Sequence, residues 1–327
     1  MRAKPRAGHL LVLGYPGSAP PAELLSFAAR FGLGGLILFG RNCGDTASLA
    51  ADLAEFRCRL AEVDPGSPGL VMVDQEGGRV ERFRDGVPSL PPARELALGG
   101  PAAVEDAAGA QARALRSLGV NVNLAPVCDL PRPGADGVIG DRAYAMDPDA
   151  VSACVAAHVR ATLDAGVLPC AKHFPGHGAA RVDSHAELPT LDVSVEELRR
   201  HDLGPFSAAI AAGVPLVMPG HLRVPALDDA PASLSPPWLG EVLRGELGFG
   251  GAVISDDLEM GALVGLGPPP ELAQRAVAAG CDLLIYGRNL RPGLDVVRVA
   301  EHLESQLPVA VLARAHSRVA ALRVQTL

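Results

Sequence analysis

The sequence predicts an α/β protein that folds as a single TIM (β/α)₈ barrel over residues 1–327. Three observations support this prediction. Eight short apolar runs rich in Val, Ile and Leu recur, Ala-rich segments with helical spacing follow them, and no linker or change of composition divides the chain. A length of 327 residues would also allow two domains of about 150 residues. Eight strand–helix units, however, occupy that length in one barrel.

The eight apolar runs are expected to be the strands of the barrel. Their apolarity is continuous rather than alternating, which is typical of parallel strands buried on both faces. Half of them open with Gly or Pro, which mark the turns between elements. The strands are expected at residues 9–15, 34–40, 69–76, 121–129, 167–174, 215–221, 251–257 and 281–287.

Capping signals support the helices that follow the strands. Asp45 and Asp147 can cap helix N-termini, and Ser194 with Glu197 has the spacing of a capping box. Gly213 follows the apolar stripe of the fifth helix, where a C-terminal glycine is common. A doubly wound open sheet is the alternative fold, but no GxGxxG follows the first strand. The helices are expected at residues 20–30, 45–63, 102–118, 148–165, 195–212, 236–247, 269–279 and 294–306.

Charge and hydropathy argue against several kinds of partner. The net charge of −8 leaves no general basic surface for nucleic acid. No apolar run approaches the ~18 residues of a membrane span. The basic N-terminus precedes only a short apolar stretch at residues 10–13, so we expect no cleaved signal and a cytoplasmic location. Six cysteines without a CxxC pattern are expected to be reduced thiols rather than a structural zinc site.

Polar residues gather where the predicted strands end. The active site of a (β/α)₈ barrel forms at the C-terminal ends of its strands, so these side chains are expected to share one pocket. Helix capping is the alternative role for single members of the set. The strand-end residues are Asp74, Gln75, Glu76, Asp129, Lys172, His173, His221, Asp256, Asp257 and Arg288.

The segment after the fifth strand is the densest in reactive side chains. It reads KHFPGHG at residues 172–178 and continues to Asp183, Ser184 and His185. Three histidines and an aspartate would suit zinc, but their spacing on a loop matches neither HxH nor HExxH, so no metal is expected. A purely structural hydrogen bond between Asp183 and His185 is a second alternative. An aspartate that fixes the tautomer of an imidazole also suits general acid/base catalysis near neutral pH.

The seventh strand ends in two adjacent carboxyl groups. Asp256 and Asp257 point to opposite faces of a strand, so only one of them can face the barrel axis. A carboxylate in the pocket can act as a nucleophile, a base or a metal ligand. Asp256 with a proton donor across the pocket is the minimum for a retaining glycosidase. The donor candidate here is an imidazole instead of the usual second carboxyl group.

Five sequence blocks together resemble glycoside hydrolase family 3, and within it the single-domain bacterial β-N-acetylhexosaminidases of the NagZ type. The most specific block is KHFPGHG at residues 172–178 with DSH at 183–185. The resemblance covers nearly the whole chain in order. The other blocks are DQEGGRV at 74–80, VIGDR at 138–142, LRGELGF at 243–249 and ISDDL at 254–258.

The resemblance implies a retaining mechanism with a covalent glycosyl-enzyme and no cofactor. Asp256 would be the nucleophile, and His185, paired with Asp183, would be the general acid and base. A monomeric enzyme would remove non-reducing terminal GlcNAc from GlcNAc–MurNAc cell-wall fragments during peptidoglycan recycling. The implied sugar-binding residues are Asp74, Arg82, Arg142, Lys172 and His173, with His221 and Met260 as further pocket-lining positions.

Three other functions could use the same residues. A phosphorylase with this dyad would transfer the sugar to phosphate, because a neutral imidazole does not repel that anion as a carboxylate would. A non-catalytic sugar-binding barrel would have no need of a nucleophile and a proton shuttle. A metal-dependent barrel hydrolase would lose activity in a chelator, whereas the implied hydrolase would keep it.

Overall fold

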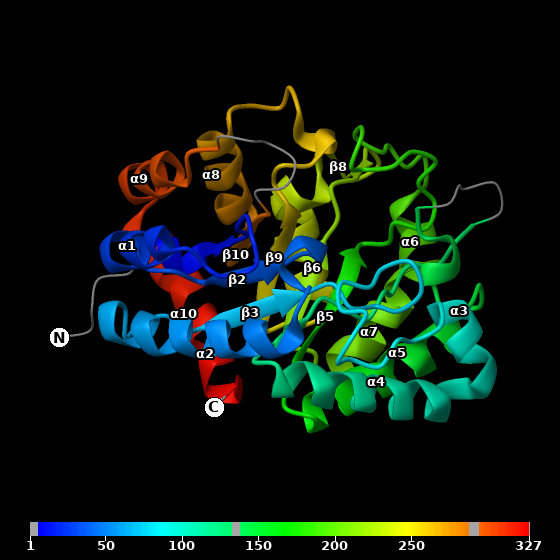
Figure 1. Ribbon diagram of the computed structural model, residues 1–327. Coiled ribbons are helices and arrows are strands. Elements are labelled where there is room, and N and C mark those ends of the chain that lie inside the picture. Colours follow the sequence, from blue (N-terminus) through cyan, green and yellow to red (C-terminus); the bar gives the residue numbers. More distant parts are fainter. Residues whose placement is uncertain (1–5, 133–137, 288–293, 327) are drawn as a thin grey trace.

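The computed structural model describes residues 6–132, 138–287 and 294–326, and within them eight parallel strands close into a barrel (Figure 1). The first strand pairs with the second on one side and with the last on the other, which completes the circle. The predicted TIM barrel is therefore confirmed, and the open sheet is excluded. The strands are β1 (Leu11–Leu13), β2 (Gly35–Leu38), β3 (Leu70–Val73), β4 (Val122–Asn123), β5 (Leu168–Phe174), β6 (Leu216–Pro219), β9 (Ala252–Asp257) and β10 (Leu283–Tyr286).

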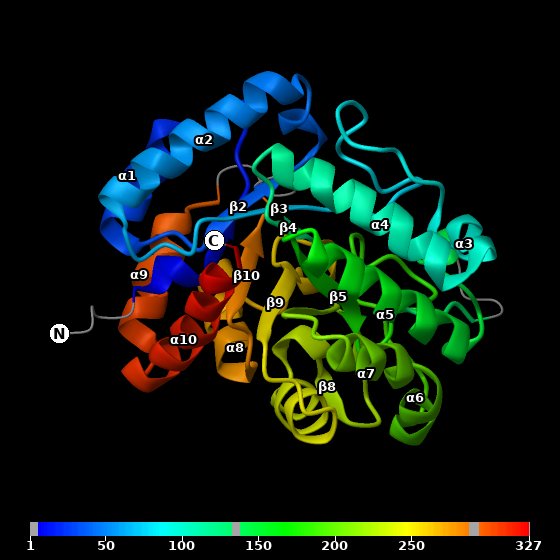
Figure 2. The same ribbon diagram turned by 90° about the horizontal axis from the view of Figure 1, so that it is seen from below.

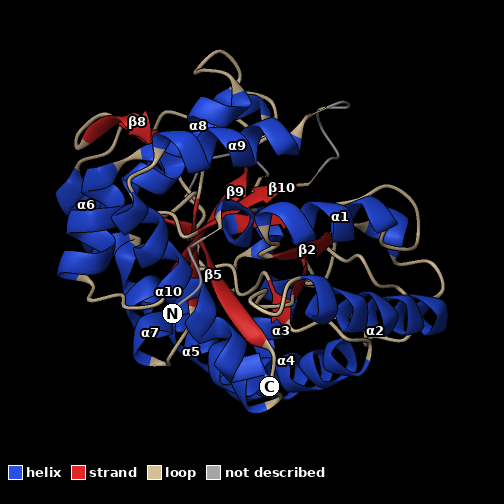
Figure 3. Ribbon diagram, turned by 90° about the vertical axis from the view of Figure 1, so that its left-hand side faces the viewer, coloured by secondary structure: helices blue, strands red, loops and turns tan. Residues whose placement is uncertain are grey.

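Helices surround the strands on the outside, as Figure 3 shows with helices in blue and strands in red. None of the helices in the described part of the chain is long and apolar enough to cross a membrane. The larger helices are α1 (Ala22–Phe31), α2 (Thr46–Val63), α4 (Gly100–Ser117), α5 (Pro148–Asp164), α6 (Val195–His201), α7 (Leu203–Ala211), α8 (Pro269–Ala279), α9 (Val296–Gln306) and α10 (Val309–Thr326).

The barrel interior is filled by alternate strand residues, as the period of two requires. Val12 of β1 packs inside the barrel, while Leu11 and Leu13 pack outward against the helices. Two side chains of α10, Val319 and Leu322, join the interior cluster. Figure 2 shows α10 from below, in red, beside β9 and β10. The last helix therefore covers the N-terminal end of the barrel and leaves the C-terminal end for the site.

The helix expected at residues 195–212 is two helices, and this part of the prediction was wrong. Asp202 ends α6 and begins α7. Its buried carboxylate pairs with Arg132 at 2.5 Å, which anchors the junction to the loop after β4. Pro205 lies in the first turn of α7, where it lacks an N–H and would clash with the preceding turn of a continuous helix.

Other elements also differ from the expected ones. The fourth strand, expected at residues 121–129, is limited to β4, because Pro126 offers no N–H and pairing resumes only as a bridge between Val127 and Lys172. The helix expected at 236–247 is present as a π-helix over Pro237–Glu246. Elements that we did not predict are α3 (Ala93–Leu96), α10 and the hairpin of β7 (Arg223–Val224) with β8 (Asp228–Pro231).

Candidate active site

A cavity of about 700 Å³ opens at the C-terminal ends of the strands. Asp74, which follows β3, and Asp256, which lies in β9, both line it. A smaller pocket of about 120 Å³ adjoins the cavity and shares these two residues with it. We call the smaller space the inner pocket. The inner pocket is lined by Asp74, Glu76, Val80, Arg82, Val138, Arg142, Lys172, His173, His177, Ser184, His185, Met218 and Asp256.

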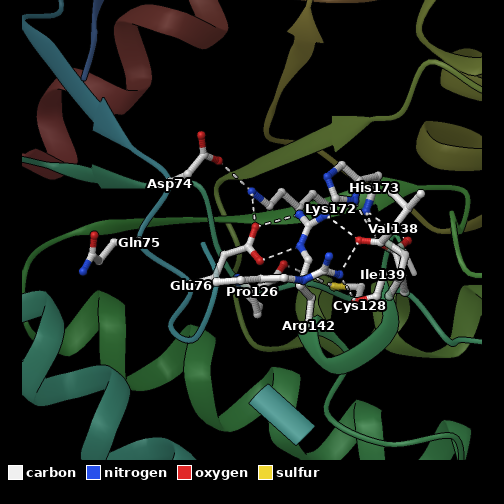
Figure 4. A network of polar contacts seen from close by, with 12 residues as sticks. Asp74, Gln75, Glu76, Pro126, Cys128, Val138, Ile139, Arg142, Lys172 and His173 are labelled. Atoms are coloured by element: carbon white, nitrogen blue, oxygen red, sulfur yellow. Dashed lines mark hydrogen bonds and ion pairs between the residues drawn. The ribbon is translucent and has the colours of Figure 1, made fainter. Parts of the chain in front are cut away.

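A network of alternating charges forms one wall of the inner pocket (Figure 4). Lys172 Nζ lies 2.7 Å from Asp74 Oδ1 and 2.8 Å from Glu76 Oε1. Arg142 donates two hydrogen bonds of 2.8 Å to the two oxygens of Glu76. Arg82 Nη2 lies 3.5 Å from Asp74 Oδ2. Each carboxylate is therefore held between two cations.

The network keeps its members ionised although they are buried. Burial raises the pKa of Glu76, but Lys172 and Arg142 together hold it below its ordinary value. Burial also raises the pKa of Asp74, but Lys172 and Arg82 outweigh the effect of burial and hold this pKa below its ordinary value. Burial lowers the pKa of Lys172, but Asp74 and Glu76 hold it above its ordinary value. Rigid charged donors and acceptors at this spacing suit a ligand with several hydroxyl groups.

Another buried carboxylate, outside this network, positions the segment after β5. Asp129 is fully buried and accepts hydrogen bonds from the ring Nδ1 of His173 at 2.7 Å and from the backbone N–H of His177 at 2.7 Å. Burial raises the pKa of Asp129, but His173 and His177 outweigh it and keep the carboxylate ionised. The ring of His173 therefore has its Nδ1 committed to Asp129, and the residue lines the inner pocket.

Asp256 presents its carboxylate to the cavity from β9. The backbone N–H of Asp257 donates to Asp256 Oδ1 at 2.8 Å. Burial raises the pKa of Asp256, but His221, His173 and this N–H outweigh it, so the carboxylate is ionised at neutral pH. The fully buried His221 donates from Nε2 to the carbonyl of Asp257 at 3.0 Å, and its Nδ1 lies 2.7 Å from Ser233 Oγ. Asp256 can therefore act as a nucleophile or as a base.

The Asp183–His185 pair lies on an exposed loop above this carboxylate. Asp183 Oδ1 accepts both the backbone N–H and the ring Nδ1–H of His185, each at 2.8 Å. This arrangement leaves Nε2 of His185 for a ligand, and the residue lines both the cavity and the inner pocket. Ser184 between them is buried, with Oγ 3.2 Å from His177 Nε2. The pair has the geometry of an oriented imidazole that can give and accept a proton.

The structure brings most of the residues predicted for the site to one end of the barrel. Asp183 contacts His185 from outside the cavity, and His221 contacts the backbone beside Asp256. Arg288 lies outside the described residues. The roles of all these residues stay predictions. Those that line the cavity or the inner pocket are Asp74, Glu76, Arg82, Arg142, Lys172, His173, His185, Asp256, Asp257 and Met260.

Three residues with a part in the site were not among the predicted binding residues. Glu76, Asp129 and His177 each hold another site residue through a hydrogen bond or an ion pair. The strand-end pattern placed Glu76 and Asp129 in the predicted pocket, but it gave them no binding role. His177 has no comparable signal, because its role depends on the course of the loop.

The histidine-rich segment does not gather its side chains around one point. The rings of His173 and His177 meet edge to face with centroids 5.7 Å apart, whereas His185 pairs with Asp183. Within the described ranges, no group of three or more His, Cys, Asp or Glu side chains is arranged to hold a metal ion.

Comparison with known proteins gives a consistent result. Residues 9–327 match the glycosyl hydrolase family 3 N-terminal domain. A relative from Alkalilimnicola ehrlichii named beta-hexosaminidase is 40% identical over 322 residues, which cover 94% of this chain and 88% of the relative.

Solved structures agree with the sequence match. A family 3 β-N-acetylglucosaminidase from Paenibacillus superposes with a TM-score of 0.91 at 34% identity, covering 100% of this chain and 63% of that one. The NagZ structure from Neisseria gonorrhoeae has a TM-score of 0.79 at 30% identity, covering 98% of this chain and 99% of that one. Because the family match extends over nearly the whole sequence, the chain belongs to glycosyl hydrolase family 3.

Proposed function

We propose that this protein is a retaining β-N-acetylglucosaminidase that removes non-reducing terminal GlcNAc from GlcNAc–MurNAc cell-wall fragments. We further propose that it acts as a monomer in the cytoplasm, in peptidoglycan recycling. One observation carries the proposal. The ionised carboxylate of Asp256 and the oriented imidazole of His185 line the same cavity, next to a charged network that suits sugar hydroxyls.

The comparisons support the enzyme class. The chain belongs to a glycoside hydrolase family, and the Alkalilimnicola ehrlichii relative is a beta-hexosaminidase. The Paenibacillus structure is that of a β-N-acetylglucosaminidase. A β-N-acetylhexosaminidase is therefore the class of glycosidase that the relatives favour. The proposed mechanism and dyad rest on the geometry of this chain, and the proposed natural substrate rests on the family resemblance.

In the first step, a carboxylate oxygen of Asp256 attacks the anomeric carbon of the bound sugar. The bond from that carbon to the glycosidic oxygen breaks, and the leaving oxygen takes the proton from Nε2 of His185. The ionised state of Asp256 makes it available for attack. The carboxylate of Asp183 at Nδ1 stabilises the imidazolium before the transfer and holds the ring in place.

In the second step, water attacks the same carbon from the side that the leaving group has vacated. Nε2 of His185 takes a proton from the water, and the bond to Asp256 breaks to restore the carboxylate. Two inversions give net retention at the anomeric carbon. Asp74, Lys172 and Arg142 would hold the sugar hydroxyls through both steps, and contacts that strengthen in the transition state would accelerate them.

A panel of 4-nitrophenyl β-glycosides tests this function. We expect kcat/KM for the N-acetylglucosaminide to exceed that for the glucoside and the xyloside by about 100-fold or more. Asp256→Ala should lower kcat for that substrate by about 10⁴-fold, while Asp229→Ala, at an exposed carboxyl outside the site, should not change it. A preference for the glucoside, or an active Asp256→Ala variant, would overturn the proposal.

The products separate hydrolysis from the alternative reactions. Proton NMR of the first product should show the β-anomer of free GlcNAc, which is the retained configuration. Because the proton acceptor is an imidazole, phosphate could replace water, and GlcNAc 1-phosphate formed in phosphate buffer would identify a phosphorylase. Loss of activity in a chelator would favour a metal-dependent hydrolase.

A further inference from the structure

Two loops of the site are joined through their backbones. The backbone N–H of Gly261 donates to the carbonyl of His185 at 3.0 Å, and that of Ala262 donates to the carbonyl of Ser184 at 3.0 Å. Gly261 and Ala262 begin the short 3₁₀ turn Gly261–Leu263, shortly after β9 has delivered Asp256. The loop with the imidazole is therefore attached to the loop that leaves the carboxylate.

The side chains of the dyad cannot hold this loop by packing. Those of Asp183 and His185 are 51% and 63% exposed. Between them lies the buried Ser184, whose Oγ is 3.2 Å from His177 Nε2. The backbone hydrogen bonds from Gly261 and Ala262 therefore contribute much to fixing the position of His185.

Close approach at this contact requires glycine. A Cβ atom at position 261 would lie 2.4 Å from the carbonyl oxygen of His185 and 2.5 Å from that of Ala186. Both distances are far below van der Waals contact, and the atoms met belong to backbone. The φ of Gly261 is not in the left-handed region, so the requirement is for space and not for conformation.

The same short segment is tied to the nucleophile at its other end. The backbone N–H of Met260 donates to the carbonyl of Asp257 at 3.0 Å, and the backbone N–H of Asp257 donates to Asp256 Oδ1 at 2.8 Å. Hydrogen bonds and the peptide units between them thus link the side-chain carboxylate of Asp256 to the backbone carbonyl of His185. The segment is short and turned, so it has little freedom to change the separation of its ends.

We infer that Gly261 is a positioning residue that docks the His185 loop at the distance from Asp256 which proton transfer requires. The inference rests on the proposed function, because it assigns His185 the proton transfer. Gly261 touches neither the sugar nor the reacting atoms. Its effect on the reaction passes through the backbone of His185.

This role predicts a selective kinetic defect in Gly261→Ala. The added methyl group must push the His185 loop away, while Asp256 and the sugar-binding network stay in place. The value of kcat/KM reports steps up to formation of the glycosyl-enzyme, and that step depends on His185 only when the leaving group needs a proton. We expect kcat/KM to fall about 30- to 100-fold for the phenyl β-N-acetylglucosaminide and less than about 3-fold for the 2,4-dinitrophenyl analogue.

A double-mutant cycle separates docking from general damage. In the His185→Ala background, Gly261→Ala should have no further effect on kcat/KM for the phenyl substrate, because the group it positions is gone. Azide, which attacks a glycosyl-enzyme without a base, should raise kcat of Gly261→Ala with the dinitrophenyl substrate and leave the wild type unchanged. Gly250→Ala is the control, since position 250 is exposed and has open space for a Cβ.

The inference and the proposed function fail in different ways. If the wild type does not hydrolyse aryl N-acetylglucosaminides, the proposed function is wrong. If the wild type is active and Gly261→Ala behaves like Gly250→Ala, or loses both substrates equally, the docking role is wrong. If Gly261→Ala melts far below the wild type, Ala262→Pro takes its place in the test. This variant removes the second N–H donor without adding a Cβ at position 261. It must then show the same selective loss for the inference to stand.

Discussion

The carboxyl group of Asp257 lies one residue from Asp256, in the wall of the cavity. Its Oδ1 accepts the backbone N–H groups of Glu259 at 3.0 Å and Gly287 at 3.3 Å. Burial raises the pKa of Asp257 to about 7, in spite of these hydrogen bonds. The adjacent aspartates therefore differ in ionisation, because His221 and His173 favour the charged form of Asp256, whereas the neighbouring carboxylates oppose that of Asp257.

Asp257→Asn should make the stability of the protein less dependent on pH. The unfolded carboxyl group ionises near pH 4 and the folded one near pH 7, so the folded state holds the extra proton between these values. Stability therefore falls as pH rises through this window. The slope is about 1.36 kcal/mol per pH unit in the middle of this window and falls near pH 7, where the folded group is half titrated, so the wild type loses about 2 kcal/mol from pH 5 to pH 7 through this group.

Asn keeps an oxygen acceptor for both N–H groups and does not titrate. The free energy of unfolding is measured in urea at pH 5 and at pH 8. The value for Asp257→Asn minus the value for the wild type should be about 2–3 kcal/mol higher at pH 8 than at pH 5. Asp229→Asn, at an exposed carboxyl, serves as the control. A difference from the wild type that is the same at both pH values would show that Asp257 is not protonated in the folded state.

The strand-end pattern was sufficient to predict which residues meet, but not how they pair. Asp74, Lys172 and Asp256 all end predicted strands, and parallel strands bring their ends to one side. Which carboxylate meets Lys172 depends on register and side-chain reach, and the lysine in fact bridges Asp74 and Glu76. The partner of His221 could not be predicted, because Ser233 follows a hairpin that the periodicity did not reveal.

At the scale of elements, most strands and helices could be predicted because each has a continuous apolar run or an amphipathic stripe. The last helix, α10, was missed because eight strand–helix units were already complete before it. Its buried residues Val319 and Leu322 belong to the cluster that fills the barrel, in addition to the strand residues that periodicity predicts. The break at Asp202 was missed because it depends on Arg132, 70 residues earlier in the chain.

Leu322→Ala should destabilise the protein strongly although it lies close to the C-terminus. Its side chain is 2% exposed in the cluster that fills the barrel. Removing it leaves a cavity in a closed interior, which costs about 2–5 kcal/mol. Val309→Ala in the same helix is the matched control, because Val309 is 60% exposed and its truncation should change stability by less than about 0.5 kcal/mol. Equal effects in urea unfolding would show that α10 does not close the barrel.

At the scale of the whole molecule, closure of the barrel creates the site. The polar groups at the C-terminal end come from segments between residues 74 and 256, and they meet only because β1 and β10 complete the circle. The opposite end is occupied by α10. The chain has a net charge of −8, yet Arg82, Arg142 and Lys172 line the inner pocket. Cations and carboxylates thus balance one another in the lining of the inner pocket, and the overall charge does not indicate these buried cations.

Because unfolding disperses these groups, a ligand that they hold should stabilise the whole fold. GlcNAc that binds only the native state adds RT ln(1 + [L]/Kd) to the free energy of unfolding, which is about 2.7 kcal/mol at 100 times Kd. We expect the thermal midpoint to rise with GlcNAc concentration, and to rise much less with glucose. Asp74→Asn removes one carboxylate charge from the network and should abolish most of the GlcNAc shift. An equal shift with glucose, or an undiminished shift in Asp74→Asn, would place the sugar elsewhere than in the inner pocket.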